Sequence, residues 1–318
     1  MKTSIKNLPN TIFSNSLILF ALFSLATLAN ASGPNCDDPR AAIIGTPDSE
    51  MNGFFIGANG CAYDPKLVTS DEVPPFGQTS GYVGDPIFMV NGGNVTELGV
   101  DVRLEGMWLI KKRPVIGIYN AKMDVKSEAK KFIDPYNKVS ATIRAEAFSR
   151  ILDNRRFSVI SLSQSGFLVG RGLRQLVKDI EETFPLQPFY RQKLLKLVNV
   201  ETQAGLGLYY PDGPNYVHYV NRRDIIPVKA GMLSSRAHPG RGAVIASFSY
   251  SNKSCEYGII PLEEYPGVDG DLSENRAPSF GAKVHSLCTY AVTGLKFEEL
   301  RKHAPLTGHA FVEIDLTP

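Results

Sequence analysis

The stretch that most constrains the fold runs from Phe157 to Glu182, where a short apolar segment changes abruptly into a helical pattern. Its first part, Phe-Ser-Val-Ile-Ser-Leu, is apolar and contains β-branched residues, which predicts a buried strand. From Phe167 onward, apolar residues recur at close to a helical period, which predicts a helix. The chain therefore turns directly from a strand into a helix at Ser163.

The turn itself reads Ser161-Leu-Ser163-Gln-Ser165-Gly166 and is a variant of the nucleophile elbow, in which small residues flank a serine held in a strained backbone. In such an elbow, the amide of the next residue, Gln164, points at the oxygen of a carbonyl under attack. Both glycines of the usual Gly-x-Ser-x-Gly pattern are serine here. The alternative is an ordinary amphipathic helix with Ser163 as its N-cap.

The first 31 residues have the pattern of a secretory signal peptide. Lys2 and Lys6 precede an uncharged apolar run over residues 17–28, and Ala29-Asn-Ala31 supplies a small-x-small cleavage site. The apolar run is shorter than the ~20 residues that a membrane span needs. We therefore expect an exported protein, periplasmic or extracellular, that begins at Ser32 and has no transmembrane segment.

Charge and cysteine content restrict the partners and the chemistry. The 318-residue chain has a net charge of +2, carried by the two leader lysines, so nothing favours a nucleic-acid partner. The four cysteines follow the leader, where oxidation is expected, and allow three pairings. Proximity favours Cys36 with Cys61 and Cys255 with Cys288. Their spacing is not that of zinc ligands, and we expect neither a metal nor another cofactor.

Beyond residues 32–84, which are rich in Gly, Pro, Asp and Ser and which we interpret as an irregular N-terminal extension, strand and helix patterns alternate. This alternation predicts an α/β domain over residues 85–300: a three-layer sandwich with a mostly parallel central sheet. Residues 301–318 are left as a C-terminal tail. Besides the strand and helix around Ser163, the expected strands are 86–90, 114–119, 197–202, 216–220 and 243–248, and the expected helices are 98–111 and 140–152.

Three further segments carry candidate site residues. Gly92 and Gly93 follow the strand 86–90 and could bring a second amide close to a substrate oxygen, although a simple strand-ending turn explains them equally well. Asp224 follows the strand 216–220, and His285 lies beyond the last expected strand. An acid after a late strand and a histidine after the final one match the Ser, Asp, His chain order of α/β hydrolases.

Taken together, these segments resemble bacterial lipase-like α/β hydrolases and are similar to class 3 lipases in particular. The resemblance covers roughly residues 86–290 and rests on the order of the motifs Pro-Val-Ile-Gly-Ile-Tyr-Asn120, Ser-Leu-Ser163-Gln-Ser-Gly, Asn-Arg-Arg-Asp224-Ile-Ile-Pro and His285-Ser-x-x-x-Tyr290. In that family the elbow serine, this aspartate and the late histidine form the triad. The resemblance thus implies Ser163 as nucleophile, Asp224 as orienting acid and His285 as base, without a cofactor.

These observations lead to an exported serine hydrolase that cleaves small-molecule or lipid esters through an acyl-enzyme. The amides of Gln164 and of Gly92 or Gly93 would stabilise the oxyanion. His218, which lies within an expected strand, is interpreted as a packed or half-exposed side chain. The alternatives are a catalytically degenerate hydrolase domain that binds a ligand or partner, motivated by the two serine-for-glycine replacements, and a structural envelope protein.

Overall fold

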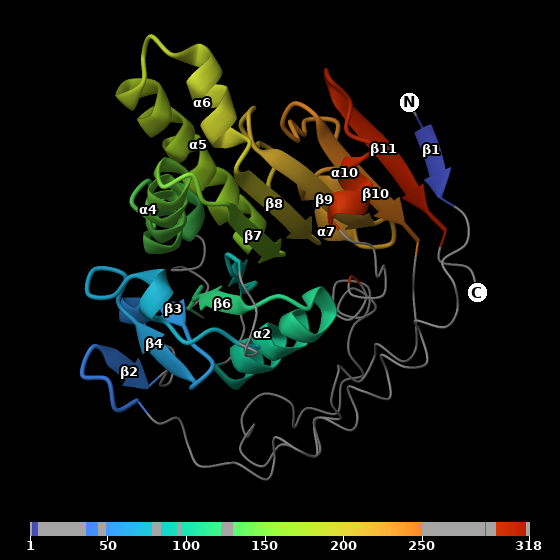
Figure 1. Cartoon of the computed structure of the whole chain (residues 1–318). Coiled ribbons are helices and arrows are strands. Elements are labelled where there is room, and N and C mark those ends of the chain that lie inside the picture. Colours follow the sequence, from blue (N-terminus) through green and yellow to red (C-terminus); the bar gives the residue numbers. More distant parts are fainter. Residues whose placement is uncertain are drawn as a thin grey trace, which may run out of the picture.

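A computed structural model describes residues 2–5, 36–43, 49–77, 84–93, 97–121, 130–249, 290 and 297–315. The protein has an α/β architecture built on one mixed, mostly parallel sheet of eleven strands (Figure 1). From one edge to the other, the strand order is β1-β11-β10-β9-β8-β7-β5-β6-β3-β4-β2. The predicted α/β class and the mostly parallel sheet are confirmed.

The centre of the sheet is parallel and its far end is antiparallel. All neighbours from β1 through β6 run parallel, whereas β3 pairs antiparallel with β6 and β4, and β4 pairs antiparallel with β2. The strands are β1 (Lys2–Ile5), β2 (Ala41–Ile43), β3 (Phe55–Ile56), β4 (Cys61–Tyr63), β5 (Ile87–Val90), β6 (Val115–Ile118), β7 (Phe157–Leu162), β8 (Val198–Gln203), β9 (Asn215–Asn221), β10 (Ala243–Phe248) and β11 (His309–Ile314).

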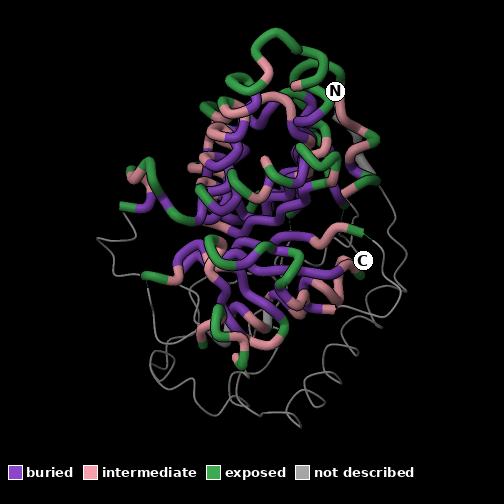
Figure 2. The backbone as a smooth tube through the Cα atoms, turned by 60° about the vertical axis from the view of Figure 1, so that its left-hand side comes forward, coloured by how far each residue is buried: buried purple, intermediate pink, exposed green. Residues whose placement is uncertain are grey.

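Helices cover both faces of this sheet. Two apolar clusters show this: one joins buried residues of α4 (Lys138–Leu152), α5 (Ser165–Thr183) and α6 (Pro188–Leu195) to one face of the strands. The other joins α2 (Glu97–Lys111) and α10 (Phe297–Arg301) to the opposite face. The buried segments accordingly run through the middle of the molecule (Figure 2). Strands β5 to β10 are buried at every position or nearly so, as expected for parallel strands covered on both sides.

The structure differs from the sequence-based expectation at both ends of the chain. Residues 32–84, expected to be irregular, contain β2, β3 and β4, and the expected C-terminal tail contains β11. The strands β2 to β4, of two or three residues, are too short to show a period-two pattern, so composition alone suggested a loop. Strand β11 has six residues with alternating burial, a period-two pattern that sequence reasoning missed. Lys2–Ile5, within the predicted signal peptide, form β1 beside β11. Helix α6 was also not expected.

One of the two expected disulfides lies within the described residues. Cys36 and Cys61 are bonded, with their Cα atoms 5.7 Å apart, and the bond joins the segment before β2 to β4. This pairing is confirmed. Cys255 and Cys288 lie outside the described residues.

Among the helices that the structure describes, we find none with the length and apolarity that crossing a membrane requires.

The amino-terminal edge of the sheet is held by a network of ion pairs, which we call the Arg150 network. Arg150, only 2% exposed, binds Glu146 on its own helix, Asp71 at 2.9 Å and Asp85 at 2.9 Å. Arg155, just before β7, also binds Asp71 and Asp85. Hydrogen bonds from Arg155 hold the pKa of Asp71 below its usual value. The network therefore links the N-terminal segment, α4 and the starts of β5 and β7.

Candidate active site at the carboxyl edge of the sheet

Ser163 lies at the junction of β7 and α5 in a strained backbone conformation. Its φ is +56°, a left-handed value that costs a residue with a side chain roughly 1–2 kcal/mol. The surrounding backbone holds this conformation: the Ser163 amide donates to Gln203 O at 2.9 Å, and the Ser163 carbonyl accepts from the amides of Leu206 at 2.8 Å and Gly166 at 3.1 Å. Such a strained strand-to-helix turn is the geometry that a nucleophile elbow requires.

The two serines that replace glycines are accommodated by hydrogen bonds. Both are fully buried. The Ser165 hydroxyl accepts from the Leu162 amide at 2.8 Å and lies 2.9 Å from Val90 O, so its proton can link the elbow to the end of β5. The Ser161 hydroxyl points at Glu201 O, 3.4 Å away on β8. These replacements therefore add contacts between the elbow and its neighbouring strands.

The loop that follows β5 lies directly against the elbow. A Cβ atom placed on Gly92 would be 3.4 Å from Ser163 Cβ, and one on Gly93 would be only 2.4 Å from the Oε1 atom of Gln164. A side chain at Gly93 would therefore collide with Gln164. The structure thus brings together Ser163, Gln164, Gly92 and Gly93, which lie far apart in the sequence.

A buried network of amide side chains fixes this loop, and sequence reasoning missed it. Asn91 receives a hydrogen bond from the Asn120 amide at 2.8 Å and donates to Gly92 O at 2.9 Å and Asn120 O at 2.8 Å. Asn120 in turn donates to the Gln164 side chain at 3.1 Å, and the buried Lys131 ammonium donates to Asn120 Oδ1 at 2.9 Å. The sequence does contain a sign of this network, because an asparagine follows each of two neighbouring strands: Asn91 follows β5 and Asn120 follows β6.

Asp224 lies at the same edge, beyond the end of β9. Leu162 of β7 pairs with Gln203 of β8, which pairs with Tyr219 of β9, so β7 and β9 flank β8 about 10 Å apart. The Asp224 carboxylate is 1% exposed and caps α7 (Ile225–Ala230) by accepting from the Ile226 amide at 3.1 Å. Its other oxygen accepts from the Tyr290 hydroxyl at 2.9 Å. Burial, together with the Asp224 charge, raises the pKa of Tyr290.

The histidines differ in how well they suit a catalytic role. His285, the predicted base, lies outside the described residues. His218 is fully buried within β9, between the Thr202 hydroxyl at 2.9 Å and Pro239 O at 3.0 Å. Burial lowers the pKa of His218 to about 4, so its imidazole is neutral at physiological pH. His218 is therefore packed inside the sheet, one of the two outcomes expected for it, and both ring nitrogens are engaged in structural contacts.

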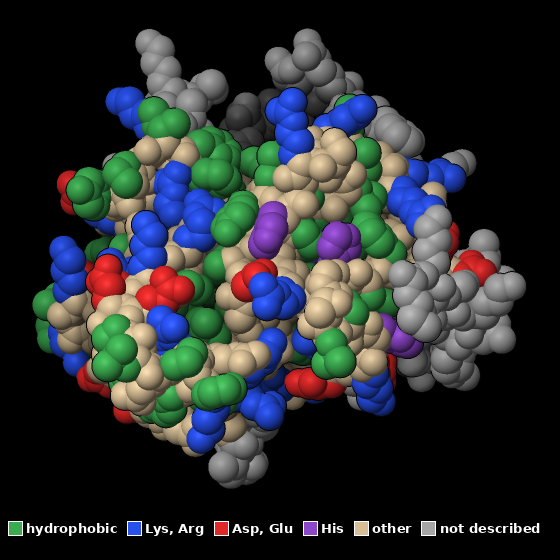
Figure 3. Space-filling model, turned by 90° about the horizontal axis from the view of Figure 1, so that it is seen from above, with side chains coloured by type: hydrophobic (Ala, Val, Ile, Leu, Met, Phe, Trp, Pro, Cys, Tyr) green, Lys and Arg blue, Asp and Glu red, His purple; other side chains and the backbone are tan. Residues whose placement is uncertain are grey.

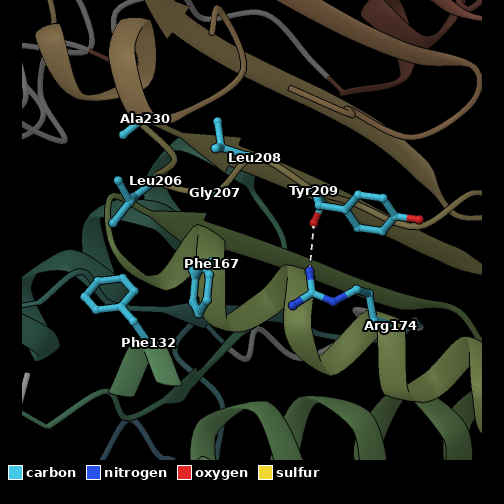
Figure 4. Close-up of a pocket in the computed structure, with 8 residues that line it drawn as sticks. All are labelled: Phe132, Phe167, Arg174, Leu206, Gly207, Leu208, Tyr209 and Ala230. Carbon is cyan, nitrogen blue, oxygen red and sulfur yellow. Dashed lines mark hydrogen bonds between the residues drawn. The ribbon is translucent and has the colours of Figure 1, made fainter. Parts of the chain in front are cut away.

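A cavity of about 600 Å³ opens beside the elbow (Figure 4). We call it the α5 pocket. Its walls come from the first turns of α5, the segment after β8, the end of α7 and Phe132; the lining residues are Phe132, Phe167, Arg174, Leu206, Gly207, Leu208, Tyr209 and Ala230. Ser163 is not among them, but the Leu206 amide binds the Ser163 carbonyl. One wall of the pocket is therefore attached to the backbone of the elbow.

No family model, curated protein or solved structure matches this chain. The described residues include no group of three or more His, Cys, Asp or Glu side chains arranged to hold a metal ion. On one face of the molecule, basic, acidic and hydrophobic side chains are interspersed (Figure 3). Any functional conclusion must therefore rest on the geometry around Ser163.

Proposed function

We propose that this protein is an exported serine hydrolase of the α/β-hydrolase type that cleaves carboxylic esters, with Ser163 as the nucleophile. The observation that carries the proposal is the left-handed backbone of Ser163 between β7 and α5, with the glycine loop after β5 packed against it. A left-handed serine is costly, and residues held in such strained conformations cluster at active sites. The described non-glycine residues with a positive φ are Lys112, Asn154, Ser163 and Ala204, and of these Ser163 alone carries a hydroxyl. An ordinary N-cap has an extended backbone and needs no such strain.

The positions of the other groups support an oxyanion site. Gln164 is the N-cap residue of the 19-residue helix α5, whose N-terminus contributes positive potential. Gly92 and Gly93 provide a second backbone segment close to Ser163 and Gln164. The Lys131 ammonium lies behind Asn120, so the environment of the site is suited to a developing negative charge.

Asp224 and His285 complete the proposed triad. The buried Asp224 carboxylate lies at the carboxyl edge, two strands from Ser163. The Tyr290 hydroxyl donates to Asp224 at 2.9 Å, and His285 precedes Tyr290 by five positions in the sequence. Asp224 would hold the imidazole in one tautomer and offset its charge when it takes the serine proton.

The proposed reaction proceeds in two balanced steps. Ser163 Oγ attacks the ester carbonyl while His285 takes its proton, and that proton then leaves with the alcohol as the acyl-enzyme forms. Water attacks the acyl carbonyl next, giving its proton to His285, and the imidazolium returns a proton to Ser163 as the acid departs. Export is proposed together with this chemistry, because the Cys36–Cys61 disulfide suits an oxidising compartment.

A fluorophosphonate probe followed by intact mass measurement tests the proposal. We expect one probe adduct on the wild-type protein, mapped to Ser163 by peptide sequencing, and none on Ser163→Ala. Ser161→Ala is the matched control, because Ser161 lies in the same elbow but its hydroxyl is buried against β8. Failure of the folded wild-type protein to react would favour the degenerate, ligand-binding alternative.

A further inference from the structure

We propose that the α5 pocket holds the acyl chain of the ester and restricts it to medium length, with Arg174 and Tyr209 forming the end of the pocket. This inference rests on the proposed function, since it assigns the substrate class of the same site. It predicts that hydrolysis favours esters of medium-chain acids over acetates and over esters of long-chain acids.

The position of the pocket places a bound chain next to the reacting carbonyl. Leu206 lines the pocket and its amide binds the Ser163 carbonyl at 2.8 Å. Phe167 lies in the first turn of α5, four positions after Ser163 in the sequence. Gly207, next to Leu206, packs closely against Phe167: a Cβ atom on Gly207 would be 3.3 Å from Phe167 Cα. The near end of the pocket is thus built on the elbow itself.

The pocket extends along α5, away from the elbow (Figure 4). Phe167 and Arg174 are seven residues apart, so they lie on one face of the helix with a separation of about 10 Å along its axis. At the far end, Arg174 Nη1 donates to Tyr209 O at 3.2 Å, and the guanidinium lies 5.6 Å from the centre of the Tyr209 ring. This pair is the structural limit on chain length.

The chemistry of the walls suits a hydrocarbon chain. Apart from Arg174, the lining side chains are aliphatic or aromatic, and Arg174 is bound to Tyr209. The cavity volume lies within the range of small-ligand sites. Each methylene buried in such a pocket favours the longer ester by roughly fourfold. The gain per methylene should fall where the chain reaches Arg174, because the charged guanidinium offers a poor surface for hydrocarbon and the neighbouring Tyr209 is 48% exposed to solvent.

The wall beside the elbow is preformed. The Phe132 and Phe167 rings meet edge to face with their centroids 5.1 Å apart. Arg171 lies over the Phe167 ring at 4.9 Å and donates to the carbonyls of Lys131, Phe132 and Asp134. These bonds fix the segment that carries Phe132. The pocket therefore requires little ordering on binding, which favours affinity.

A kinetic test uses a series of p-nitrophenyl esters from acetate to palmitate. We expect kcat/KM of the wild-type protein to rise at least about thirtyfold from acetate to octanoate, given the gain per methylene, and to fall again for palmitate. Ala230→Phe narrows the pocket and should lower the octanoate-to-acetate ratio at least about tenfold, since it displaces several methylenes. Arg174→Ala opens the far end and should shift the optimum to longer chains.

The control is Ala304→Phe, which makes the same change in a different cavity. Ala304 lines a cleft of about 610 Å³ near the start of β9 and β10, at the opposite edge of the sheet, together with charged residues such as Lys196 and Arg301. We expect its chain-length profile to match that of the wild type. If Ala230→Phe and Arg174→Ala both fold and also retain the wild-type profile, the assignment of the pocket is overturned.

A binding measurement separates this inference from the proposed function. Octanoate should displace a fluorescent fatty acid from the catalytically silent Ser163→Ala protein, and Ala230→Phe in that background should weaken octanoate binding at least about tenfold. Binding by Ser163→Ala combined with no ester hydrolysis by the wild type would support the pocket and overturn the proposed function. Hydrolysis by the wild type with no fatty-acid binding and no chain-length preference would overturn the pocket alone.

Discussion

The two edges of the central sheet both carry buried polar side chains, but these groups serve the structure differently. At the amino edge, the Arg150 network joins full charges of opposite sign across segments far apart in the sequence. At the carboxyl edge, Asn91, Asn120 and Gln164 bind one another and the backbone around a serine in a strained conformation.

This difference predicts that the amino edge contributes mainly to stability and the carboxyl edge mainly to function. Removing one member of a buried ion network leaves the others without their counter-charge, so the amino edge is costly to change. The carboxyl edge stores strain at Ser163, and its amide side chains set the backbone position of the loop after β5, with one ammonium, that of Lys131, behind Asn120. Mutations at the two edges should therefore act on different quantities: the free energy of unfolding in one case and the rate of hydrolysis in the other.

The largest effect is expected from replacing Ser163. Ser163→Ala and Ser163→Gly should each lower kcat by at least about four orders of magnitude, because the nucleophile is lost. Glycine tolerates a positive φ, whereas alanine does not. The free energy of unfolding of Ser163→Gly should therefore exceed that of Ser163→Ala by about 0.5–1 kcal/mol, a difference that already allows for the greater freedom of glycine in the unfolded chain. Steady-state kinetics and urea unfolding measure the two quantities. Equal stability of the two variants would contradict the assignment of strain to Ser163.

At the amino edge, Arg150→Ala should have the opposite profile. It removes a 2% exposed guanidinium from three carboxylates and should lower the free energy of unfolding by about 3–5 kcal/mol. Under conditions where the variant remains folded, kcat should stay within about twofold of the wild-type value, since the network is remote from the elbow. A large loss of kcat without loss of stability would show that the two edges are coupled. Denaturant titration with parallel kinetics decides between these outcomes.

His218, between the two edges, should affect the pH dependence of stability. Its pKa is lowered from 6.5 to about 4 in the folded protein, so the unfolded chain binds the proton more readily in this interval. The contribution of His218 to the free energy of unfolding is fully present above pH 6.5, and it falls by about 3 kcal/mol as the pH drops to 4. Urea unfolding at a series of pH values should therefore show that the wild type loses its advantage in unfolding free energy over His218→Asn as the pH falls from 6.5 to 4.

The His218→Asn variant also provides a control for the site. If His285 is the base, the acid limb of the pH–rate profile for hydrolysis should be the same in His218→Asn and in the wild type, because His218 touches only structural partners. A shift of that limb would instead assign the titrating base to His218 and overturn the role of His285.

The smallest effect is expected from Asn91→Ala, which loosens the glycine loop without removing a reacting group. The Asn91 side chain makes two hydrogen bonds to the backbone of Asn120 beyond β6 and one to Gly92 O within the loop. We expect kcat to fall about tenfold with little change in KM, because the oxyanion amides would be less well positioned. Asn199→Ala, a substitution of the same kind on β8, should leave kcat unchanged. A rise in KM alone would indicate a role in substrate binding.

The sequence by itself determined the parallel core and the elbow. Long buried strands and amphipathic helices have periodic patterns that can be recognised locally, and the strand-to-helix change at Ser163 is such a pattern. The Cys36–Cys61 pairing followed from proximity in the sequence, given the expectation of an oxidising compartment. The same local reasoning predicted that Gly92, Gly93 and Asp224 follow the ends of strands. In the structure these residues do follow β5 and β9, at the carboxyl edge of the sheet.

Only the tertiary structure decided which of these groups meet and what supports them. Strands β2 to β4 are too short to leave a periodic signal and form because the sheet offers a partner edge. The Arg150 network and the Asn91–Asn120–Gln164 network join residues that are up to 84 positions apart. The α5 pocket is built from four separate segments. Such contacts depend on distances in the folded chain, and no periodicity or local propensity encodes those distances.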